Sequence, residues 1–365
     1  MKVTIEKSQL SRALTAVSKG MSSRSTMPIL SGVFMEASGS RLTLRTTDLE
    51  ISVQHIVDAL IEEEGEVVVP GRLLNDIIKS LPDAAVLLST DSNGLAVSCA
   101  ESNFTLNTYN ALDFPSFPQV NTTAKAEIAA RDLQVMVKKA GKAVSRDESR
   151  PVLMGILTRV VENKMTMAAT DSYRLSVVVK EIDGAGSLEI IIPGSVLEEV
   201  ARISGVDDKV VISESENQIM FITGQTQLIS RKIEGTYPNF EVLIPSEKTT
   251  TAVLNTSELL TAIKRVALAS QNSGPVKMVF DPDLQKLTIS SKTMEVASGS
   301  ETINAQIDGE YLEIGFNHQY LTDGLSVIEN EEVSFENSGP LKSGVFKTGG
   351  DVDFLYLTMP LRIDV

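Results

Sequence analysis

Polar and apolar residues alternate at the start of the chain, which predicts a strand over residues 2–6. Apolar side chains then recur at helical spacing and predict a helix over about residues 8–20, with Ser8 as its cap. Alternating stretches from residue 33 predict further strands, and the order of strand, helix and strands starts again at residue 67. Each helix carries a single apolar stripe and can therefore cover one face of an antiparallel sheet. The pattern predicts an α+β fold.

The same pattern recurs at a constant offset of 123 positions, the distance from Pro28 to Pro151. The matching pairs are residues 28–32 and 151–155, 47–48 and 170–171, 69–71 and 192–194, and 114–117 and 237–240. A fainter third copy follows, in which Leu259 corresponds to Leu133 and Leu10. We expect three tandem similar domains over residues 1–121, 126–246 and 250–365, each with two helices on antiparallel sheets. Similar domains joined head to tail repeat one rotation, which closes into a ring or grows into a filament.

Composition is that of a soluble globular protein, with 42% hydrophobic and 22% charged residues in a chain of 365. No apolar run approaches the ~18 residues of a membrane helix, and the first residues lack the apolar core of a signal peptide. Cys99 is the only cysteine, and its alternating surroundings predict a buried thiol rather than a nucleophile. These features predict a cytoplasmic protein without a membrane partner.

The net charge of −15 argues against a nucleic-acid partner, but this charge is unevenly distributed. Six helices are predicted over about residues 8–20, 71–80, 131–143, 194–203, 257–269 and 317–328. Their basic residues are Arg12, Lys19, Arg72, Lys79, Arg131, Lys138, Lys139, Lys142, Arg202, Lys264 and Arg265, and their acidic residues are Asp76, Asp132, Glu198, Glu199, Glu258 and Asp323. The helices thus carry +5 and the rest of the chain −20, so a shared helical surface could attract phosphate without reading base sequence. A chance excess of basic residues on solvated helices is the alternative interpretation.

The chain lacks the usual signatures of catalysis. It contains no glycine-rich phosphate loop, and its two histidines, His55 and His318, lie in different repeats without a nucleophile motif beside them. The recurring Thr-Asp pairs, which end in Asp48 and Asp171, could hold a metal or share acid–base chemistry. An aspartate that hydrogen-bonds its own turn at the end of a strand explains the recurrence more simply. We therefore expect no enzyme activity and no cofactor, with a metal-dependent hydrolase as the weaker alternative.

Two segments indicate a binding surface. Residues 235–243 show little regular pattern, and the apolar tail over residues 356–363 contains Pro360 in an otherwise strand-like run. Proline restricts such a run to an edge or terminal strand, which leaves apolar side chains near the surface. Methionine is common where a surface accepts many partners, and Met359 precedes the proline. The tail predicts a groove for a peptide, and a plain core strand is the alternative.

Several stretches in a fixed order carry a resemblance to a known family, namely residues 1–6, 24–30, 47–50, 169–175, 235–240, 313–317 and 359–362. On these stretches the sequence resembles the bacterial DNA sliding clamps, the beta subunits of DNA polymerase III. The resemblance implies the DNA-clamp fold, closed as a head-to-tail homodimeric ring around duplex DNA, without catalysis or a cofactor. It implies a processivity factor that slides without sequence specificity, is opened by an ATP-dependent clamp loader, and tethers the replicative polymerase, other polymerases and repair proteins. A monomeric peptide-binding adaptor that does not encircle DNA is the alternative.

The resemblance also implies which residues bind these partners, through short linear peptides with Gln, Leu and Phe anchors. The deep part of the groove would consist of Leu153, Thr170, Leu175, Pro238, Leu243, Leu357 and Met359. The shallower part would consist of Tyr173, Arg174, Asn317, Tyr320, Pro360, Leu361 and Arg362. The candidate DNA-binding residues are Arg24 and Arg72, together with Tyr320, which lies at a position of single-strand contact in the family. Lys138, Lys139 and Lys264 are added as basic residues of the predicted helices. The chain departs from some members at Ser172-Tyr173, where they carry Gly-His, and in its last residues, Asp364-Val365.

Overall fold

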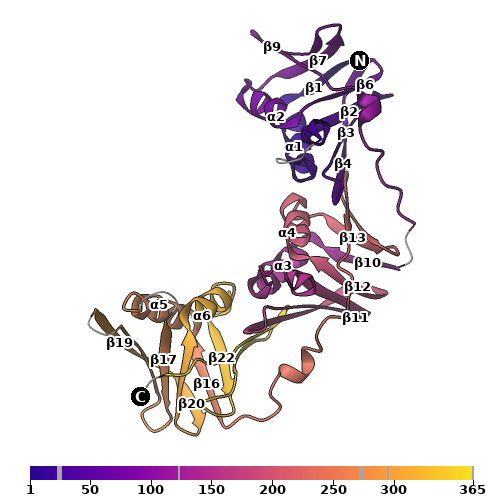
Figure 1. The fold of residues 1–365 in the computed structure, drawn as a ribbon. Helices are drawn as coiled ribbons and strands as arrows, with labels where there is room; N and C mark the ends of the chain where they lie inside the picture. The colour runs from indigo at the N-terminus through magenta and orange to yellow at the C-terminus, as the bar shows by residue number, and fades with distance from the viewer. Residues whose placement is uncertain (23–26, 122–123, 271–273, 294–295, 364–365) are drawn as a thin grey trace. The chain divides into compact units, whose positions relative to one another are not determined.

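The structure, a computed structural model, describes residues 1–22, 27–121, 124–270, 274–293 and 296–363 (Figure 1). The chain packs into two compact units. The first comprises Met1–Arg131 with Glu199–Lys232, and the second comprises Asp132–Glu198 with Ile233–Val365. Each unit contains two antiparallel sheets together with helices, which confirms the α+β prediction.

The first unit contains a five-stranded sheet, β5-β1-β7-β8-β9, and an eight-stranded sheet, β10-β13-β14-β15-β4-β3-β2-β6. Its strands are β1 (Lys2–Glu6), β2 (Gly32–Ser38), β3 (Arg41–Thr47), β4 (Ile51–Asp58), β5 (Leu60–Glu63), β6 (Gly65–Pro70), β7 (Ala85–Asp91), β8 (Gly94–Cys99), β9 (Ser102–Leu106), β10 (Ala124–Ala129), β13 (Lys209–Glu214), β14 (Gln218–Thr223) and β15 (Thr226–Arg231). The eight-stranded sheet combines two repeats, because β4 pairs with β15 and aligns Val53 with Leu228. Both side chains are buried, so this junction is stabilised by an apolar interior as well as by the ladder.

The second unit contains a seven-stranded sheet, β11-β12-β24-β23-β22-β16-β20, and a four-stranded sheet, β19-β18-β17-β21. Its strands are β11 (Gly155–Thr170), β12 (Arg174–Pro193), β16 (Thr250–Asn255), β17 (Pro275–Asp281), β18 (Lys286–Thr293), β19 (Ala297–Asn304), β20 (Gln306–Gly309), β21 (Leu312–Asn317), β22 (Glu332–Asn337), β23 (Gly344–Thr348) and β24 (Asp353–Thr358). Pairing of β12 with β24 aligns Leu175 with Leu357 and again joins two repeats within one sheet. The tail therefore lies beside the middle of the chain.

Six α-helices occur in the described ranges, in the order that the sequence pattern predicts: α1 (Lys7–Val17), α2 (Gly71–Ser80), α3 (Ala130–Ala140), α4 (Gly194–Ile203), α5 (Thr256–Ala267) and α6 (His318–Leu325). Short 3-10 turns cover Ser18–Gly20, Pro28–Ser31, Ala111–Asp113, Gly141–Ala143, Pro151–Met154 and Glu241–Leu243. The predicted cap Ser8 is wrong, because α1 begins at Lys7 after Glu6 and has no side-chain cap. The predicted cap Asn317 is confirmed: its side-chain oxygen accepts a hydrogen bond from the Gln319 N–H at 2.8 Å.

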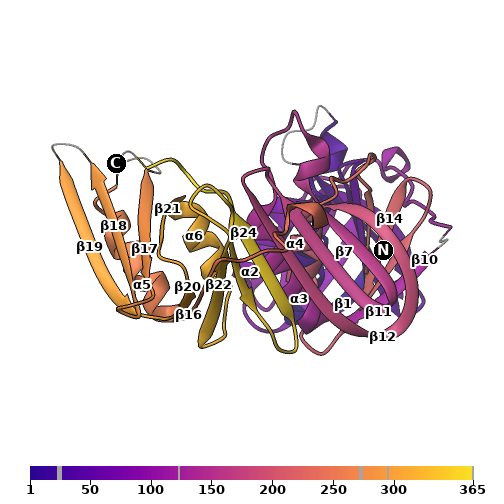
Figure 2. The same ribbon diagram turned by 90° about the horizontal axis from the view of Figure 1, so that it is seen from below.

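The helices pack through the apolar stripes that the sequence pattern shows. In the first unit α1 contacts α2 and strands β3 and β4, and Leu10 and Leu14 are fully buried. In the second unit α5 contacts α6, and both views of the ribbon place these two helices side by side (Figures 1 and 2). The opposite faces of the helices remain free to carry exposed charges.

Three other expectations concern the whole chain. Residues 132–198 of the expected central domain lie in the second unit and residues 199–232 in the first, and the boundaries 1–121, 126–246 and 250–365 stay predictions. Cys99 is buried, as predicted. None of the helices in the described ranges is both long and apolar enough to span a bilayer.

Candidate functional site

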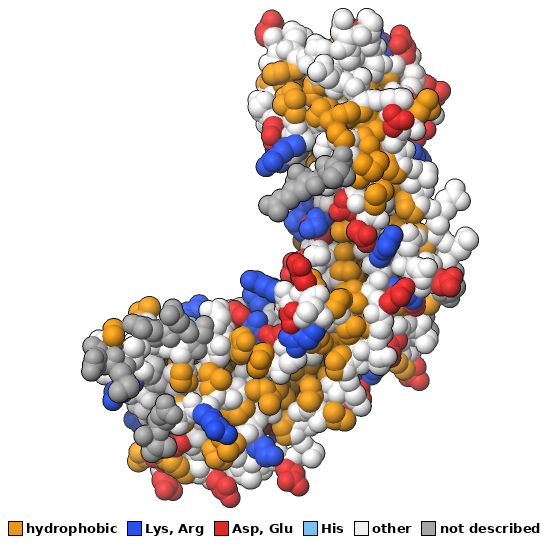
Figure 3. Space-filling model, in the orientation of Figure 1, with side chains coloured by type: hydrophobic (Ala, Val, Ile, Leu, Met, Phe, Trp, Pro, Cys, Tyr) orange, Lys and Arg blue, Asp and Glu red, His pale blue; other side chains and the backbone are white. Residues whose placement is uncertain are grey.

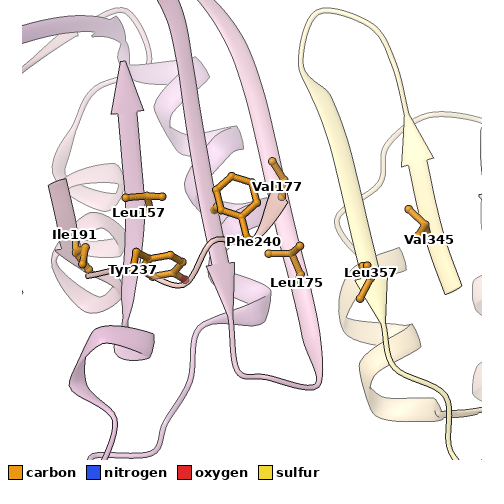
Figure 4. Close-up of a cluster of buried hydrophobic side chains, with 9 residues drawn as sticks. Leu157, Leu175, Val177, Ile191, Tyr237, Phe240, Val345 and Leu357 are labelled. Carbon is orange, nitrogen blue, oxygen red and sulfur yellow. The ribbon is translucent and has the colours of Figure 1, made fainter. Parts of the chain in front are cut away.

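A cluster of buried apolar side chains joins the central and C-terminal parts of the second unit (Figure 4). It consists of Leu157, Ala168, Leu175, Val177, Ile191, Tyr237, Phe240, Val345 and Leu357, drawn from β11, β12, β23, β24 and the segment before Glu241–Leu243. Figure 4 shows Tyr237 and Phe240 on the loop that crosses in front of the strands bearing Leu157 and Leu175. The two segments that the sequence indicated as a binding surface therefore meet at one cluster.

Tyr237 attaches the irregular segment to the sheet. Its hydroxyl oxygen accepts a hydrogen bond from the backbone N–H of Thr170 at 3.1 Å. Burial raises the pKa of Tyr237, while the bond from Thr170 acts in the opposite direction, so the hydroxyl group stays protonated at physiological pH. With Tyr237 and Phe240 buried, the neighbouring Pro238 and Leu243 remain exposed at the surface.

The residues expected in the deep part of the groove separate into a buried set and an exposed set, which we call the floor and the rim of the expected groove. Leu153, Thr170, Leu175 and Leu357 are buried and form the floor. Pro238 is exposed, and Leu243 and Met359 are each 48% exposed, so these three residues lie at the rim. Hydrophobic side chains gather at the surface of the second unit among Lys, Arg, Asp and Glu side chains (Figure 3). An apolar floor with a half-exposed apolar rim is suited to the insertion of a partner's apolar side chains.

The chain after β24 is held by its backbone on two sides. The Met359 N–H donates to the Tyr173 carbonyl oxygen at 2.9 Å, and the Leu361 N–H donates to the Gly315 carbonyl oxygen at 2.8 Å. Pro360 follows the end of the strand, as its missing N–H requires. β24 is the terminal strand of the chain, but it pairs with both β12 and β23 and is therefore not an edge of its sheet, as the alternative of a core strand has it. Leu361 is 38% exposed, and Arg362 is also exposed beside it.

The turn between β11 and β12 presents Tyr173 at the surface. The Asp171 Oδ1 atom accepts hydrogen bonds from the N–H groups of Tyr173 and Arg174, at 2.9 and 3.0 Å. Ser172 has φ +81°, and its N–H donates to the Thr170 hydroxyl oxygen. The first repeat forms the same turn, in which the Asp48 Oδ1 atom accepts from the N–H groups of Glu50 and Ile51. The structural interpretation of the Thr-Asp pairs is therefore confirmed.

Arg174 connects the turn to α6. Its Nε atom donates to Asp171 Oδ2 at 2.9 Å, and its Nη1 atom donates to Asp323 Oδ2 at 2.6 Å. Its guanidinium carbon lies 4.5 Å from the centroid of the Tyr320 ring. Burial alone would lower the pKa of Arg174, but the hydroxyl of Tyr356 and the carboxylates of Asp323 and Asp171 raise it above its ordinary value. Arg174 is thus permanently charged, and its Nε and Nη1 atoms are hydrogen-bonded within the protein.

The Tyr320 ring, which lies over this cation, stacks with a second tyrosine ring. The Tyr173 and Tyr320 rings are stacked with their centroids 6.5 Å apart, and Tyr173 is 59% exposed. Asn317, at the start of the same helix, is half-buried and uses its side-chain oxygen to cap α6. The structure thus brings Tyr173, Arg174 and Tyr320 together, with Asn317 at the start of the same helix, while Leu361 pairs with Gly315 of β21. The partners of Arg174 at Asp323 and Tyr356 were missed, because neither residue lies in a motif of its own.

The candidate DNA-binding residues have different surroundings. Arg72 on α2 and Lys264 on α5 are exposed, whereas Lys138 on α3 is exposed but ion-paired with Glu329 at 2.9 Å. Arg24 lies outside the described residues, and Tyr320 belongs to the tyrosine pair. Lys139 is only 6% exposed, and its Nζ atom lies 5.3 Å from the Phe354 ring centroid. The prediction for Lys139 is corrected, because an ammonium group covered by the protein does not reach a phosphate.

The chain is similar over its whole length to proteins of one family. Models of the N-terminal, central and C-terminal domains of the DNA polymerase III beta subunit match residues 1–118, 127–239 and 241–362. The beta sliding clamp of Streptomyces coelicolor is 32% identical and matches over 100% of both chains, and that of Bacillus subtilis is 31% identical over 99% of this chain and 100% of its own. Among solved structures, the DNA polymerase sliding clamp from Bacillus subtilis has a TM-score of 0.94 at 30% identity, with 100% of both chains covered. The sliding clamp from Pseudomonas aeruginosa bound to griselimycin has a TM-score of 0.94 at 29% identity, with the same coverage.

Proposed function

The chain belongs to the DNA polymerase III beta subunit family, and we propose that it is the ring-forming processivity factor of a replicative DNA polymerase. The ring encircles duplex DNA in the cytoplasm, slides along it without reading sequence, and catalyses no reaction. A clamp loader opens the ring with ATP, and polymerases and repair proteins bind its groove. The observation that carries the proposal is the match of all three family domains, in order, along the chain.

We propose that the ring closes by strand addition between two copies. β9 is an unpaired edge of the five-stranded sheet, and β19 is an unpaired edge of the four-stranded sheet. β9 contains no charged residue, and its Phe104 is 39% exposed. β19 contains a single charged residue, Glu301. Uncharged strand edges readily pair with another chain. If β9 of one copy pairs with β19 of the next, a head-to-tail contact forms that two copies can close.

The attraction to DNA is proposed to be weak and to involve only the backbone phosphates. Exposed Arg72, Lys138 and Lys264 each stand on a helix, and Arg24 completes the proposed set. A protein with a net charge of −15 repels DNA elsewhere. A closed ring does not depend on tight contacts, because it leaves DNA only when it opens. Weak, sequence-blind contacts allow sliding.

The groove of the second unit is proposed to tether the partners. The buried floor and half-exposed rim suit a few apolar anchors of a short peptide, and such sites bind with roughly micromolar affinity, about −8 kcal/mol. The griselimycin complex of a relative with the same fold supports ligand binding to proteins of this kind. The location of a ligand-binding groove on this chain is part of the proposal.

The decisive experiment combines a solution mass with electron microscopy of the purified protein. A closed ring at twice the chain mass of 39.4 kDa is expected, together with retention of the ring on circular, but not linear, DNA after loading. A monomer at any concentration that still binds peptides would instead identify the protein as an adaptor.

A further inference from the structure

Asp323 lies outside the expected groove residues yet contacts the centre of the shallow part. One of its carboxylate oxygens accepts from Arg174 at 2.6 Å, and the other accepts from Gln319 Nε2 at 2.9 Å. The Arg174 and Asp323 side chains are only 13% and 27% exposed. A charge-assisted bond between partly buried groups is stronger than an exposed ion pair, so this contact fixes α6 against the start of β12.

Tyr356 provides a second attachment between α6 and the sheet. Its buried hydroxyl donates a hydrogen bond to the Tyr320 carbonyl oxygen at 2.9 Å and accepts one from the Arg174 Nη1 atom at 3.4 Å. Gly324 makes this close approach possible, because a Cβ atom there would lie 2.3 Å from the Tyr356 ring. No non-glycine side chain fits unless the helix or the ring moves.

These contacts converge on the tyrosine pair. Asp323 and Gly324 lie on the same helix as Tyr320, whereas Arg174 follows Tyr173 directly. The ion pair and the Tyr356 contact therefore set the distance between Tyr173 on the turn and Tyr320 on α6. They also set the distance from this pair to Leu357 on the groove floor, because Tyr356 precedes Leu357 on β24.

We propose that Asp323, supported by Gly324, is a positioning residue that holds the tyrosine pair at a fixed distance from the deep part of the groove and thereby selects the spacing of peptide anchors. The proposal rests on the proposed peptide-binding function of the groove. Asp323 touches no partner in this scheme and acts through Arg174 and Tyr320. Without it, the deep part still accepts apolar anchors, but the shallow part no longer binds in register with it.

The test compares two fluorescein-labelled probes by anisotropy on the full-length protein. The long probe is a peptide with Gln, Leu and Phe anchors that spans both parts, and the short probe carries the Leu and Phe anchors alone. For Asp323→Asn we expect the affinity for the long probe to fall about tenfold, with the affinity for the short probe changed less than about twofold. Asp323→Glu should restore part of the long-probe affinity, because it keeps the charge. A long probe with one residue inserted between its anchors should bind the wild type weakly. The same inserted probe should bind Asp323→Asn no more weakly than the uninserted long probe binds this variant.

Two further variants separate positioning from general destabilisation. Gly324→Ala should reproduce the selective loss of the long probe, because it displaces α6 from Tyr356. Glu329→Gln, which removes an exposed ion pair with Lys138, should change neither affinity. Equal affinities of wild type and Asp323→Asn for the long probe would overturn the proposal, as would a parallel loss of both probes. If the wild type binds neither probe, the proposed function of the groove fails instead.

Discussion

The Tyr237 hydroxyl and the Thr170 backbone N–H form a hydrogen bond of 3.1 Å that attaches the segment at 237–243 to the end of β11. The bond is buried, because Thr170 and Tyr237 are 4% and 9% exposed. One irregular segment thereby acquires a fixed position relative to the groove floor, and Leu243 acquires a fixed position at its rim.

Tyr237→Phe should lower the free energy of unfolding of the second unit by about 1–3 kcal/mol, because it leaves the Thr170 N–H buried without an acceptor. Chemical denaturation followed by far-UV circular dichroism measures the change. Tyr311→Phe serves as the control, since it also removes a hydrogen-bonded tyrosine hydroxyl, here one that donates to Glu313, but from a residue that is 56% exposed. Equal effects of the two variants would contradict the structural role of the buried bond.

Met359→Glu should reduce the affinity for an anchor-bearing peptide by about a hundredfold or more, because a carboxylate at the apolar rim must be desolvated when the peptide binds. Isothermal titration measures this affinity, and the thermal midpoint should stay close to that of the wild type because Met359 is half exposed. Leu112→Glu is the matched control, because Leu112 is a more exposed apolar residue, at 86%, and belongs to the first unit. Retained affinity in Met359→Glu would exclude Met359 from the site.

Combined reversal of Arg72, Lys138 and Lys264 to Glu should weaken retention on circular DNA and flatten its salt dependence, because three phosphate-attracting charges become repulsive. Retention after gel filtration at two salt concentrations measures the effect. Reversal of Lys125, Lys286 and Lys292, which are exposed on or next to strands, is the control of equal charge change. Equal losses in both triple variants would show that net charge, rather than the helical surface, determines retention.

Phe104→Arg should shift the protein from dimer to monomer, because it places a charge in the exposed β9 edge proposed to pair with β19. Sedimentation equilibrium measures the mass. Leu112→Arg is the control and should remain a dimer, because Leu112 is 86% exposed and lies outside β9 and β19. A stable dimer of Phe104→Arg would refute the assignment of the edge.

Lys139→Met should stabilise the protein at neutral pH by about 1 kcal/mol, because it removes a covered ammonium group. Burial lowers the pKa of Lys139 below its ordinary value of 10.5, so the folded state binds fewer protons than the unfolded state between the two pKa values. The free-energy cost of burying the Lys139 charge is fully present at pH values below the pKa of Lys139 in the folded state. It disappears as pH rises toward the pKa of Lys139 in the unfolded state. Denaturation at pH 7 and about pH 10 should therefore show the advantage of Lys139→Met shrinking with rising pH.

The repeated periodicity was sufficient to predict six helices, the antiparallel sheets and the recurring Thr-Asp turn, because these features depend on neighbours a few residues apart. The repeat alone also predicted that segments 123 positions apart adopt one local structure, and the equivalent turns at Asp48 and Asp171 agree. Local hydrogen bonds and apolar spacing determine such features without reference to the rest of the chain.

Only the tertiary structure decided which side chains face one another across the repeats. Lys138 and Lys139 are neighbours on one helix, yet only Lys139 is covered, because Phe354 from the far end of the chain packs over it. Asp323 looks like an ordinary exposed helical acid until the pairing of β12 and β24 and the packing of α6 bring Arg174 to it. Contacts between residues distant in sequence depend on how sheets and helices pack, and a single sequence does not encode that packing in any local pattern.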